Sequence, residues 1–226
     1  MSAPAMSMPC RVEFGGEVLW LLPECGVWWP ATDTLFVADL HLGKAASFRA
    51  LGQPVPSGTT QDNLERLTQL VTRHDARRLV FLGDMLHAAP AQRESVMAPL
   101  RRWRTQHAAL DCVLVRGNHD RHAGDPPSDL GIAVVDEPWS PMPGSTLVAC
   151  HHPQQAPGRM VLAGHWHPTV TLYGSAHDRQ RLPCFCRSAG MLVLPAFGAF
   201  TGGSSQPLPR GARLYAVGAG QVWALA

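Results

Sequence analysis

The segment CVLVRGNHD, residues Cys112–Asp120, is the part of the sequence from which the fold is best inferred. Its first four residues are apolar and predict a short buried β-strand. Gly117 then allows the backbone to turn closely, and Asn118, His119 and Asp120 follow. Taken alone, Asn-His-Asp is ordinary loop composition. The pattern becomes informative because other strands of the chain end in a similar way.

Four further apolar runs end in side chains that can bind a metal ion. They lead into Asp39-Leu40-His41, Gly83-Asp84, Cys150-His151-His152 and Gly164-His165-Trp166-His167. An Asp at one strand end is more often a turn former or a cap, and a single H-x-H is weak evidence for metal binding. Five such strand ends in succession instead predict one shared site. Carboxylate, imidazole and amide ligands suit Mn, Fe or Zn.

The first half of the chain predicts alternating strands and helices. We expect a hairpin over Arg11–Leu22, strands at 35–38, 79–82 and 112–115, and helices at 59–74 and 91–107. Thr59 with Asp62 predicts an N-terminal cap for the first helix, and Pro99 predicts a break or kink in the second. Strand–helix alternation implies a parallel sheet covered by helices, with ligands gathering beyond the carboxyl ends of its strands.

The second half of the chain predicts mostly strands. We expect them at 146–149, 160–163, 169–173, 191–194, 212–217 and 222–225. These strands would form a second sheet packed on the first. With 226 residues and no internal repeat or long linker, the chain is expected to form a single α/β domain over residues 1–226.

Composition excludes several classes of protein. Of the residues, 46% are hydrophobic and only 16% are charged, which allows a sizeable core without disulfides. The net charge of +2 argues against a strongly basic nucleic-acid coat protein, although it allows a local basic patch. No apolar run is long enough to predict a membrane-spanning helix, and residues 1–9 lack the features of a signal peptide. We therefore expect a cytoplasmic protein with no membrane partner.

The six cysteines are expected to be reduced and mostly buried. Four are scattered through apolar stretches, at Cys10, Cys25, Cys112 and Cys150. Cys184 and Cys186 form a C-x-C, a spacing that by itself is weak evidence for zinc.

In their order along the chain, the five strand-end motifs resemble the signature of the calcineurin-like metallophosphoesterases. The resemblance spans residues 39–167, and the terminal strands fit the same fold. It implies an α/β fold, a four-layer α/β/β/α sandwich of two mixed sheets flanked by helices. It also implies a site for two divalent metal ions at one edge of the sheets, with manganese as the expected metal and iron or zinc as alternatives.

The resemblance assigns a role to each residue of this site. One metal ion would be bound by Asp39, His41 and His167, the other by Asn118, His151 and His165, and both by the bridging Asp84. We prefer His151 over the adjacent His152 as the ligand, because His151 directly follows the strand and a small residue.

The chemistry implied is hydrolysis of phosphodiesters. A phosphodiester is anionic and repels hydroxide, so two divalent ions serve to neutralise it and to activate a bridging water that attacks phosphorus in line. His119 would act as general acid or stabilise the transition state, with Asp120 orienting it. No serine or cysteine nucleophile is required.

Several shorter segments resemble the ligase-associated branch of this family. They are LGKA (42–45), FR (48–49), GQPVP (52–56), GTT (58–60) and LPAFGAFTGG (194–203). That branch is encoded in bacteria beside an ATP-dependent DNA ligase, a helicase and an exonuclease. The resemblance therefore implies a nuclease acting on DNA in repair, functionally associated with those enzymes.

Four side chains near the motifs are candidates for substrate contact, namely Lys44, Arg49, His87 and His152. The two cations could instead be solvated surface charges, and His87 could support a metal ligand from behind. Phe197 and Phe200 could stack a base, although aromatic residues in this setting are more often part of the core. The best remaining basic cluster consists of Arg179, Arg181 and Arg187.

Two other functions are alternatives to a DNA phosphodiesterase. The same chemistry could serve a small nucleotide, a nucleotide-sugar lipid or a phosphoprotein, since fold does not settle function. The second alternative is a non-catalytic scaffold. Such scaffolds usually lose ligands or the acid, whereas here all seven ligand candidates and His119 are present.

Overall fold

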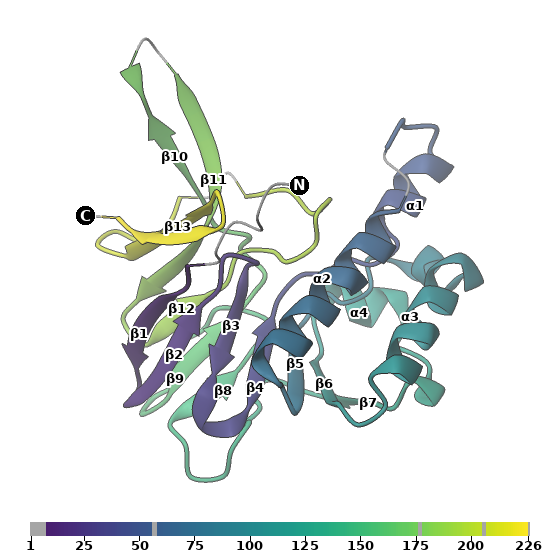
Figure 1. Cartoon of the computed structure of the whole chain (residues 1–226), viewed down its shortest axis with the longest axis horizontal. Helices are drawn as coiled ribbons and strands as arrows, with labels where there is room; N and C mark the ends of the chain where they lie inside the picture. The colour runs from purple at the N-terminus through teal and green to yellow at the C-terminus, as the bar shows by residue number, and fades with distance from the viewer. Residues whose placement is uncertain (1–7, 56–57, 176–177, 205–206, 226) are drawn as a thin grey trace.

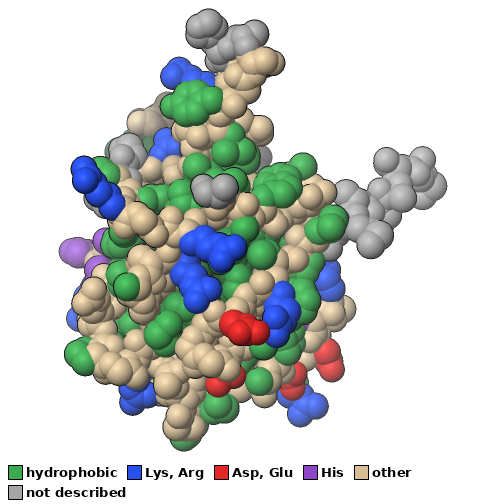
Figure 2. Space-filling model, turned by 90° about the vertical axis from the view of Figure 1, so that its left-hand side faces the viewer, with side chains coloured by type: hydrophobic (Ala, Val, Ile, Leu, Met, Phe, Trp, Pro, Cys, Tyr) green, Lys and Arg blue, Asp and Glu red, His purple; other side chains and the backbone are tan. Residues whose placement is uncertain are grey.

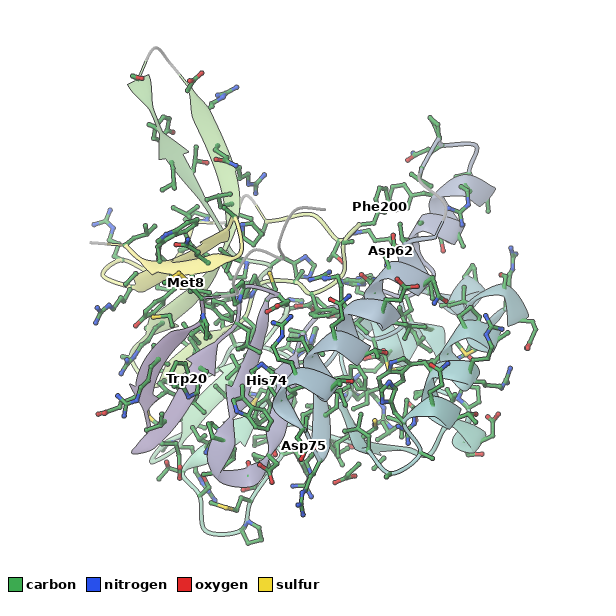
Figure 3. All side chains as sticks on the ribbon, in the orientation of Figure 1. Met8, Trp20, Asp62, His74, Asp75 and Phe200 are labelled. Carbon is green, nitrogen blue, oxygen red and sulfur yellow. The ribbon has the colours of Figure 1, made fainter. Side chains whose placement is uncertain are left out.

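Two β-sheets packed face to face form the centre of the molecule (Figure 1). The computed structural model describes residues 8–55, 58–175, 178–204 and 207–225, so Pro56, the last residue of the predicted GQPVP segment, lies outside the described residues. Within these ranges each sheet has seven strands. Side chains from both sheets fill the space between them (Figure 3), among them Phe36 and Val80 from the first sheet and Leu162 and Phe185 from the second.

The first sheet is built from the N-terminal part of the chain. Its strands lie side by side in sequence order: β1 (Cys10–Phe14), β2 (Glu17–Leu21), β3 (Gly26–Trp29), β4 (Thr34–Val37), β5 (Arg78–Leu82), β6 (Asp111–Val115) and β7 (Ile132–Val135). Strands β1 to β4 pair antiparallel, and β4 to β7 pair parallel. The parallel strands are apolar on both faces because both faces are covered. In β5, Leu79 packs toward the helices and Val80 toward the second sheet.

The α-helices cover the outer face of the first sheet (Figure 1). They are α1 (Lys44–Ala50), α2 (Thr59–His74), α3 (Glu94–Gln106) and α4 (Asn118–Ala123), with 3₁₀ segments at Pro30–Thr32, Ala89–Gln92 and Ser128–Leu130. In α2, Leu64, Leu67 and Val71 recur on one face of the helix and are buried in this layer. Every helix in the described ranges is too short or too polar to cross a bilayer.

The second sheet contains the later strands. Their order is β14 (Gln221–Ala224), β13 (Arg213–Gly218), β11 (Arg179–Ser188), β12 (Met191–Val193), β9 (Met160–Ala163) and β8 (Leu147–Ala149), and β10 (Thr169–Tyr173) pairs with β11 beside this path. Strand β9 runs parallel to both of its neighbours, whereas the remaining pairs are antiparallel. On the outer face, Val148, Cys150 and Val161 form a small apolar cluster against which Ala156 packs.

The predicted fold of two mixed sheets with flanking helices is confirmed. The hairpin over residues 11–22 is β1–β2, the helix at 59–74 is α2, and the six later strands lie within one residue of their expected positions. The second helical layer of the expected four-layer sandwich differs, because all α-helices of the described ranges precede β7 and lie on the first sheet. A loop carrying Ala156 packs on the outer face of the second sheet.

Three local predictions were wrong. Gly58, with a φ of 89°, is the residue before α2, and no side chain caps that helix. The helix predicted at 91–107 is interrupted at Arg93 and then continues through Pro99, because burial of the α3 face that carries Val96 and Trp103 outweighs the missing hydrogen bond at the proline. Strands β3, β7 and β11 were not predicted.

All six cysteines are free thiols, and five of them are buried, as expected. Cys184 and Cys186 lie on β11, where burial raises the pKa of the first to about 12 and that of the second to about 11. Neither belongs to a group of metal-capable side chains within the described residues. These thiols are therefore part of the core.

Candidate metal centre

The polar residues at the strand ends meet at one edge of the two sheets. In the first sheet, Asp39 follows β4, Asp84 follows β5 and Asn118 follows β6, and parallel pairing brings these loops side by side. The second sheet contributes His151 after β8, and His165 and His167 after β9. The backbone N–H of His165 donates to Asp39 Oδ2 at 2.9 Å and so joins the two sheets at this edge.

The first group of side chains consists of Asp39, His41 and His167. Asp39 Oδ1 lies 3.3 Å from His167 Nε2, and each residue offers one ligand atom within 4.8 Å of the others. Asp39 and His41 are buried, yet Asp39 Oδ1 and His41 Nε2 have no hydrogen-bond partner within the described residues. Buried polar atoms without a partner are costly, and a cation held by the group would satisfy both.

The second group consists of Asn118, His151 and His165. The ring of His151 is fully buried, with Nδ1 lying 3.0 Å from the carbonyl oxygen of Leu82. Because a carbonyl only accepts, this nitrogen carries the proton and Nε2 keeps its lone pair. Nε2 faces Asn118 Oδ1 at 2.9 Å and His165 Nδ1 at 3.1 Å. His151 Nε2 and Asn118 Oδ1 are both acceptors, and at this distance they repel one another unless a cation lies between them.

Asp84 lies between the two groups. Its Oδ2 is 3.7 Å from His41 Nε2, and its Oδ1 is 3.4 Å from His151 Nε2. Oδ1 also accepts a hydrogen bond from the backbone N–H of His119 at 2.9 Å. One carboxylate oxygen thus faces each group, which is the arrangement that a bridging ligand requires.

Burial sets the protonation of these side chains. Burial, more than any neighbouring charge, lowers the pKa of His41 to about 2 and that of His165 to about 4. Both imidazoles are therefore neutral, so the contact of His41 with Asp84 is not an ion pair. Burial also raises the pKa of Asp84. Neutral imidazole is the form that binds a metal ion, and a cation would compensate the buried carboxylates.

The backbone of the site adopts a conformation that most residues avoid. Five members of the two groups and the bridge have positive φ angles between 45° and 68°: Asp39, His41, Asp84, His165 and His167. For residues other than glycine this conformation costs on the order of 1 kcal/mol each. The surrounding packing holds these residues in place, and the tight turns direct their side chains into one small volume.

Two of the strand-end glycines allow the close approach of these side chains. A Cβ atom added to Gly83 would lie 2.1 Å from His151 Nδ1. A Cβ atom added to Gly117 would lie 2.3 Å from Asp84 Oδ1. Both distances are far below van der Waals contact, so each position requires glycine.

His119 borders the site and is oriented by a carbonyl group. Its Nδ1 lies 2.7 Å from the carbonyl oxygen of His87 and therefore carries the proton, which leaves Nε2 facing Asp84 Oδ2 at 4.0 Å. The Asp120 carboxylate instead accepts from the backbone N–H groups of Leu86 and Gly117, each at 3.0 Å. The contact that orients the His119 ring is therefore made by the His87 carbonyl. Asp120 instead connects the loop after β5 to the loop after β6 through its two hydrogen bonds.

Three of the four candidate substrate contacts border the same site. The His87 ring stacks on the His119 ring with centroids 5.0 Å apart, and its Nδ1 lies 3.3 Å from His41 Nδ1. His152 is partly exposed, and its ring centroid is 4.6 Å from that of His165. Lys44 is half-buried and donates to the carbonyl of Thr201 at 2.9 Å. Arg49 is exposed in the last turn of α1.

The two phenylalanines do not form a base-stacking surface together. Phe197 is buried, and the guanidinium carbon of Arg66 lies 4.2 Å from its ring centroid, so this residue is part of the core. Phe200 meets Phe48 of α1 edge to face at 5.8 Å, beside the helical layer (Figure 3).

The predicted basic cluster is divided in the structure. Arg179, Arg181 and Arg187 all lie on β11. Arg187 lies six positions after Arg181, which corresponds to roughly 20 Å along a strand. The guanidinium of Arg187 lies 5.6 Å from the ring centroid of Phe14, against the first sheet, whereas the other two arginines lie where β11 pairs with β10.

Sequence analysis missed Glu137. Its carboxylate accepts hydrogen bonds from the backbone N–H groups of His151 at 2.6 Å and His152 at 2.9 Å, and its Oε1 lies 2.6 Å from His152 Nδ1. Glu137 therefore fixes the loop that carries the second group. It lies in the loop after β7, a strand that was itself not predicted, so no motif marked it.

The chain is similar in sequence and in structure to known phosphoesterases. Residues 33–153 match the calcineurin-like phosphoesterase family. The crystal structure of the Pseudomonas putida nuclease MPE has 44% sequence identity and a TM-score of 0.83, and the match covers 96% of this chain and 100% of that one. The phosphoesterase Yfce from E. coli has 18% identity and a TM-score of 0.39 over 80% of this chain and 86% of its own. No curated protein sequence matches the chain.

Proposed function

Because the chain belongs to the calcineurin-like phosphoesterase family, and is thus a hydrolase of phosphoester bonds, we propose that its substrate is a DNA phosphodiester. The observation that carries this proposal is the similarity to a nuclease over 96% of the chain. Proteins of this family typically bind two metal ions, and the buried His and Asp groups of this chain are consistent with a dinuclear site. A nuclease substrate is therefore favoured over a small nucleotide or a phosphoprotein.

The proposed metal ligands are the two groups described above. One ion would be held by Asp39, His41 and His167, the second by Asn118, His151 and His165, and Asp84 would contact both. The buried atoms without partners and the two facing acceptors, His151 Nε2 and Asn118 Oδ1, support this assignment. Manganese fits the mixture of carboxylate, imidazole and amide ligands, with iron or zinc as alternatives. Divalent ions bound there supply Lewis acidity, which neutralises the phosphate charge and activates water.

Side chains of the protein itself would protonate the leaving group and attract the phosphate. His119 keeps its proton on Nδ1 through the His87 carbonyl, so Nε2 is the nitrogen that would take up a second proton and pass it to a departing oxygen. The stacked His87 ring limits the movement of the His119 ring, and Asp120 acts only on the backbone, at the start of the short helix that carries His119. Lys44, held by the Thr201 carbonyl, places a cation beside the first group and can attract the phosphate.

The same proposal also covers the domain organisation, the cellular location and the functional partners of the protein. The chain would act as one domain, which is supported by a core cluster drawn from both sheets. It would work in the cytoplasm, where a DNA substrate is found. Its resemblance to the ligase-associated branch supports functional association with a DNA ligase, a helicase and an exonuclease.

A substrate panel tests the proposal. The protein, loaded with Mn, is offered an aryl phosphate monoester, an aryl phosphodiester, single-stranded DNA and duplex DNA at low salt. We expect hydrolysis of the diester over the monoester, and cleavage of at least single-stranded DNA. The same protein treated with a chelator is the control. Hydrolysis of aryl diesters without cleavage of any DNA form would overturn the DNA assignment in favour of a small nucleotide.

A further inference from the structure

Strands β10 and β11 form a two-stranded ribbon that projects beyond the second sheet (Figure 1). Their pairing is antiparallel, with Tyr173 opposite Arg179 and Thr171 opposite Arg181. Side chains of directly opposed residues lie on the same face of a ribbon, and that face recurs at every second residue. Tyr173, Arg179, Thr171 and Arg181 therefore share one face.

This face combines an exposed aromatic ring with positive charge. Tyr173 is 82% exposed, so the face of its ring is open to solvent. Arg179 is exposed, and within the described ranges it makes no hydrogen bond or ion pair. Among the described residues of the ribbon and its turn, Asp178 is the acidic one. Figure 2 shows hydrophobic and basic side chains side by side on the projecting ribbon.

The base of the same face opens into a cavity beside the candidate metal centre. The cavity has a volume of about 340 Å³ and is lined by His167, Thr169, Arg181, Arg66 and the loop at 195–203. Arg181 Nε donates to Thr169 Oγ1 at 2.8 Å, and a second guanidinium nitrogen donates to the carbonyl of Ser204. His167, in the first group of metal-capable residues, lies two positions before β10. The ribbon face and the metal centre are thus joined by one continuous surface.

We propose that this face of the β10–β11 ribbon, with the cavity at its base, binds a single-stranded DNA segment adjoining the scissile phosphate. The inference rests on the nuclease function proposed above. An exposed tyrosine stacks on an unpaired base, and an arginine beside it contacts the backbone phosphate. In a duplex the base faces are already stacked, so Tyr173 would have no partner there. Two arginines give a short footprint, in keeping with the net charge of +2.

Substitutions on the two faces of the ribbon test the inference. Binding of the Mn-loaded protein to a hydrolysis-resistant, phosphorothioate-linked single-stranded 12-mer is measured by fluorescence anisotropy over a range of salt concentrations. Tyr173→Ala should weaken binding on the order of tenfold without changing the salt slope, and Tyr173→Phe should restore it. Arg179→Ala should weaken binding and reduce the salt slope by about 0.7. The matched control is Gln180→Ala, which lies between the two arginines on the opposite face.

Turnover separates this inference from the proposed function. The ratio of single-stranded DNA cleavage to aryl diester hydrolysis should fall at least fivefold in the Tyr173→Ala, Arg179→Ala double variant, and the aryl diester rate reports whether that variant is folded. If the double variant binds and cleaves single-stranded DNA as the wild type does, the ribbon assignment is wrong and the nuclease assignment stands. An equal loss of duplex binding would also contradict a stacking role. If the wild type cleaves no DNA, the proposed function itself fails.

Discussion

At the scale of single residues, backbone carbonyl groups decide which imidazole nitrogen is available in the site. The carbonyl of Leu82 holds the proton of His151 on Nδ1, and the carbonyl of His87 does the same for His119. In both rings the lone pair on Nε2 is thereby directed into the site. One ring can then serve as a metal ligand and the other as a proton carrier, although they belong to the same residue type.

Asp84 is predicted to affect both metal positions, because one of its oxygens faces each group. Asp84→Ala should abolish hydrolysis of an aryl phosphodiester and lower the metal content at both positions. His41→Ala should lower the content mainly at one. Metal analysis of the Mn-reconstituted variants measures the difference. Near-wild-type turnover by Asp84→Ala would show that the ligand assignment is wrong.

His119 is predicted to matter most when the leaving group is basic. If its Nε2 delivers a proton, His119→Ala should lower the rate by on the order of 10²–10⁴-fold with an alkyl or nucleoside leaving group. An activated aryl group departs without a proton, so the loss there should be much smaller. Steady-state rates on a matched pair of diesters provide the comparison. Equal losses on both would mean that His119 positions the phosphate and transfers no proton.

Ligand candidates were visible in the sequence, whereas the residues that orient them were not. Asp39, Asp84 and Asn118 each follow an apolar strand, and parallel strands bring their carboxyl ends to one edge whatever the details of packing. The contacts of Glu137 and of the His87 carbonyl depend instead on the path of a loop through space. No spacing rule predicts such main-chain contacts, and the orienting role of Asp120 was implied by the family resemblance alone.

At the scale of secondary structure, β3 and β11 were missed for different reasons. Strand β3 has only four residues, begins with a glycine and is followed directly by Pro30, and glycine and proline are typical of a turn or loop. In β11, residues 184–186 are buried in the sheet, but the preceding segment projects into solvent and carries Arg179 and Arg181. The two parts of β11 therefore differ in composition, and no single periodic pattern runs along the whole strand. Helix α2 was predicted to the residue because its buried face repeats regularly, and only its cap was wrong, since the left-handed Gly58 precedes the helix and no side chain caps it.

Gly117, at the junction of β6 and α4, is predicted to be essential although it is not a ligand. Its φ of −91° is accessible to any residue, so alanine would fail there only because its Cβ would lie 2.3 Å from Asp84 Oδ1. Gly117→Ala should therefore displace Asp84 and reduce both Mn binding and aryl diester turnover at least tenfold. Gly218→Ala in β13, where the nearest contact is 3.3 Å, is the control. Wild-type Mn affinity in Gly117→Ala would refute this reading of the turn.

At the scale of the whole molecule, the two sheets contribute different proposed ligands to the same candidate centre. Asp39, Asp84 and Asn118 come from the first sheet, whereas the histidines at 151, 165 and 167 come from the second. The hydrophobic core between the two sheets joins them through apolar contacts. A metal ion at the edge would join the two sheets at a further point, through polar side chains that otherwise repel one another or lack hydrogen-bond partners.

Metal binding is therefore predicted to stabilise the entire fold. An ion that binds the folded chain at 100 times its dissociation constant adds about 2.7 kcal/mol to the free energy of unfolding. For a chain of this size that corresponds to a rise in Tm of roughly 5–10 °C. Thermal unfolding of chelator-treated protein, with and without added Mn, should show this rise as one cooperative transition, because the ligands span both sheets. Asp84→Ala should lose most of the Mn-dependent rise. A Tm unaffected by Mn in the wild type would mean that the two groups do not bind the ion in the folded state.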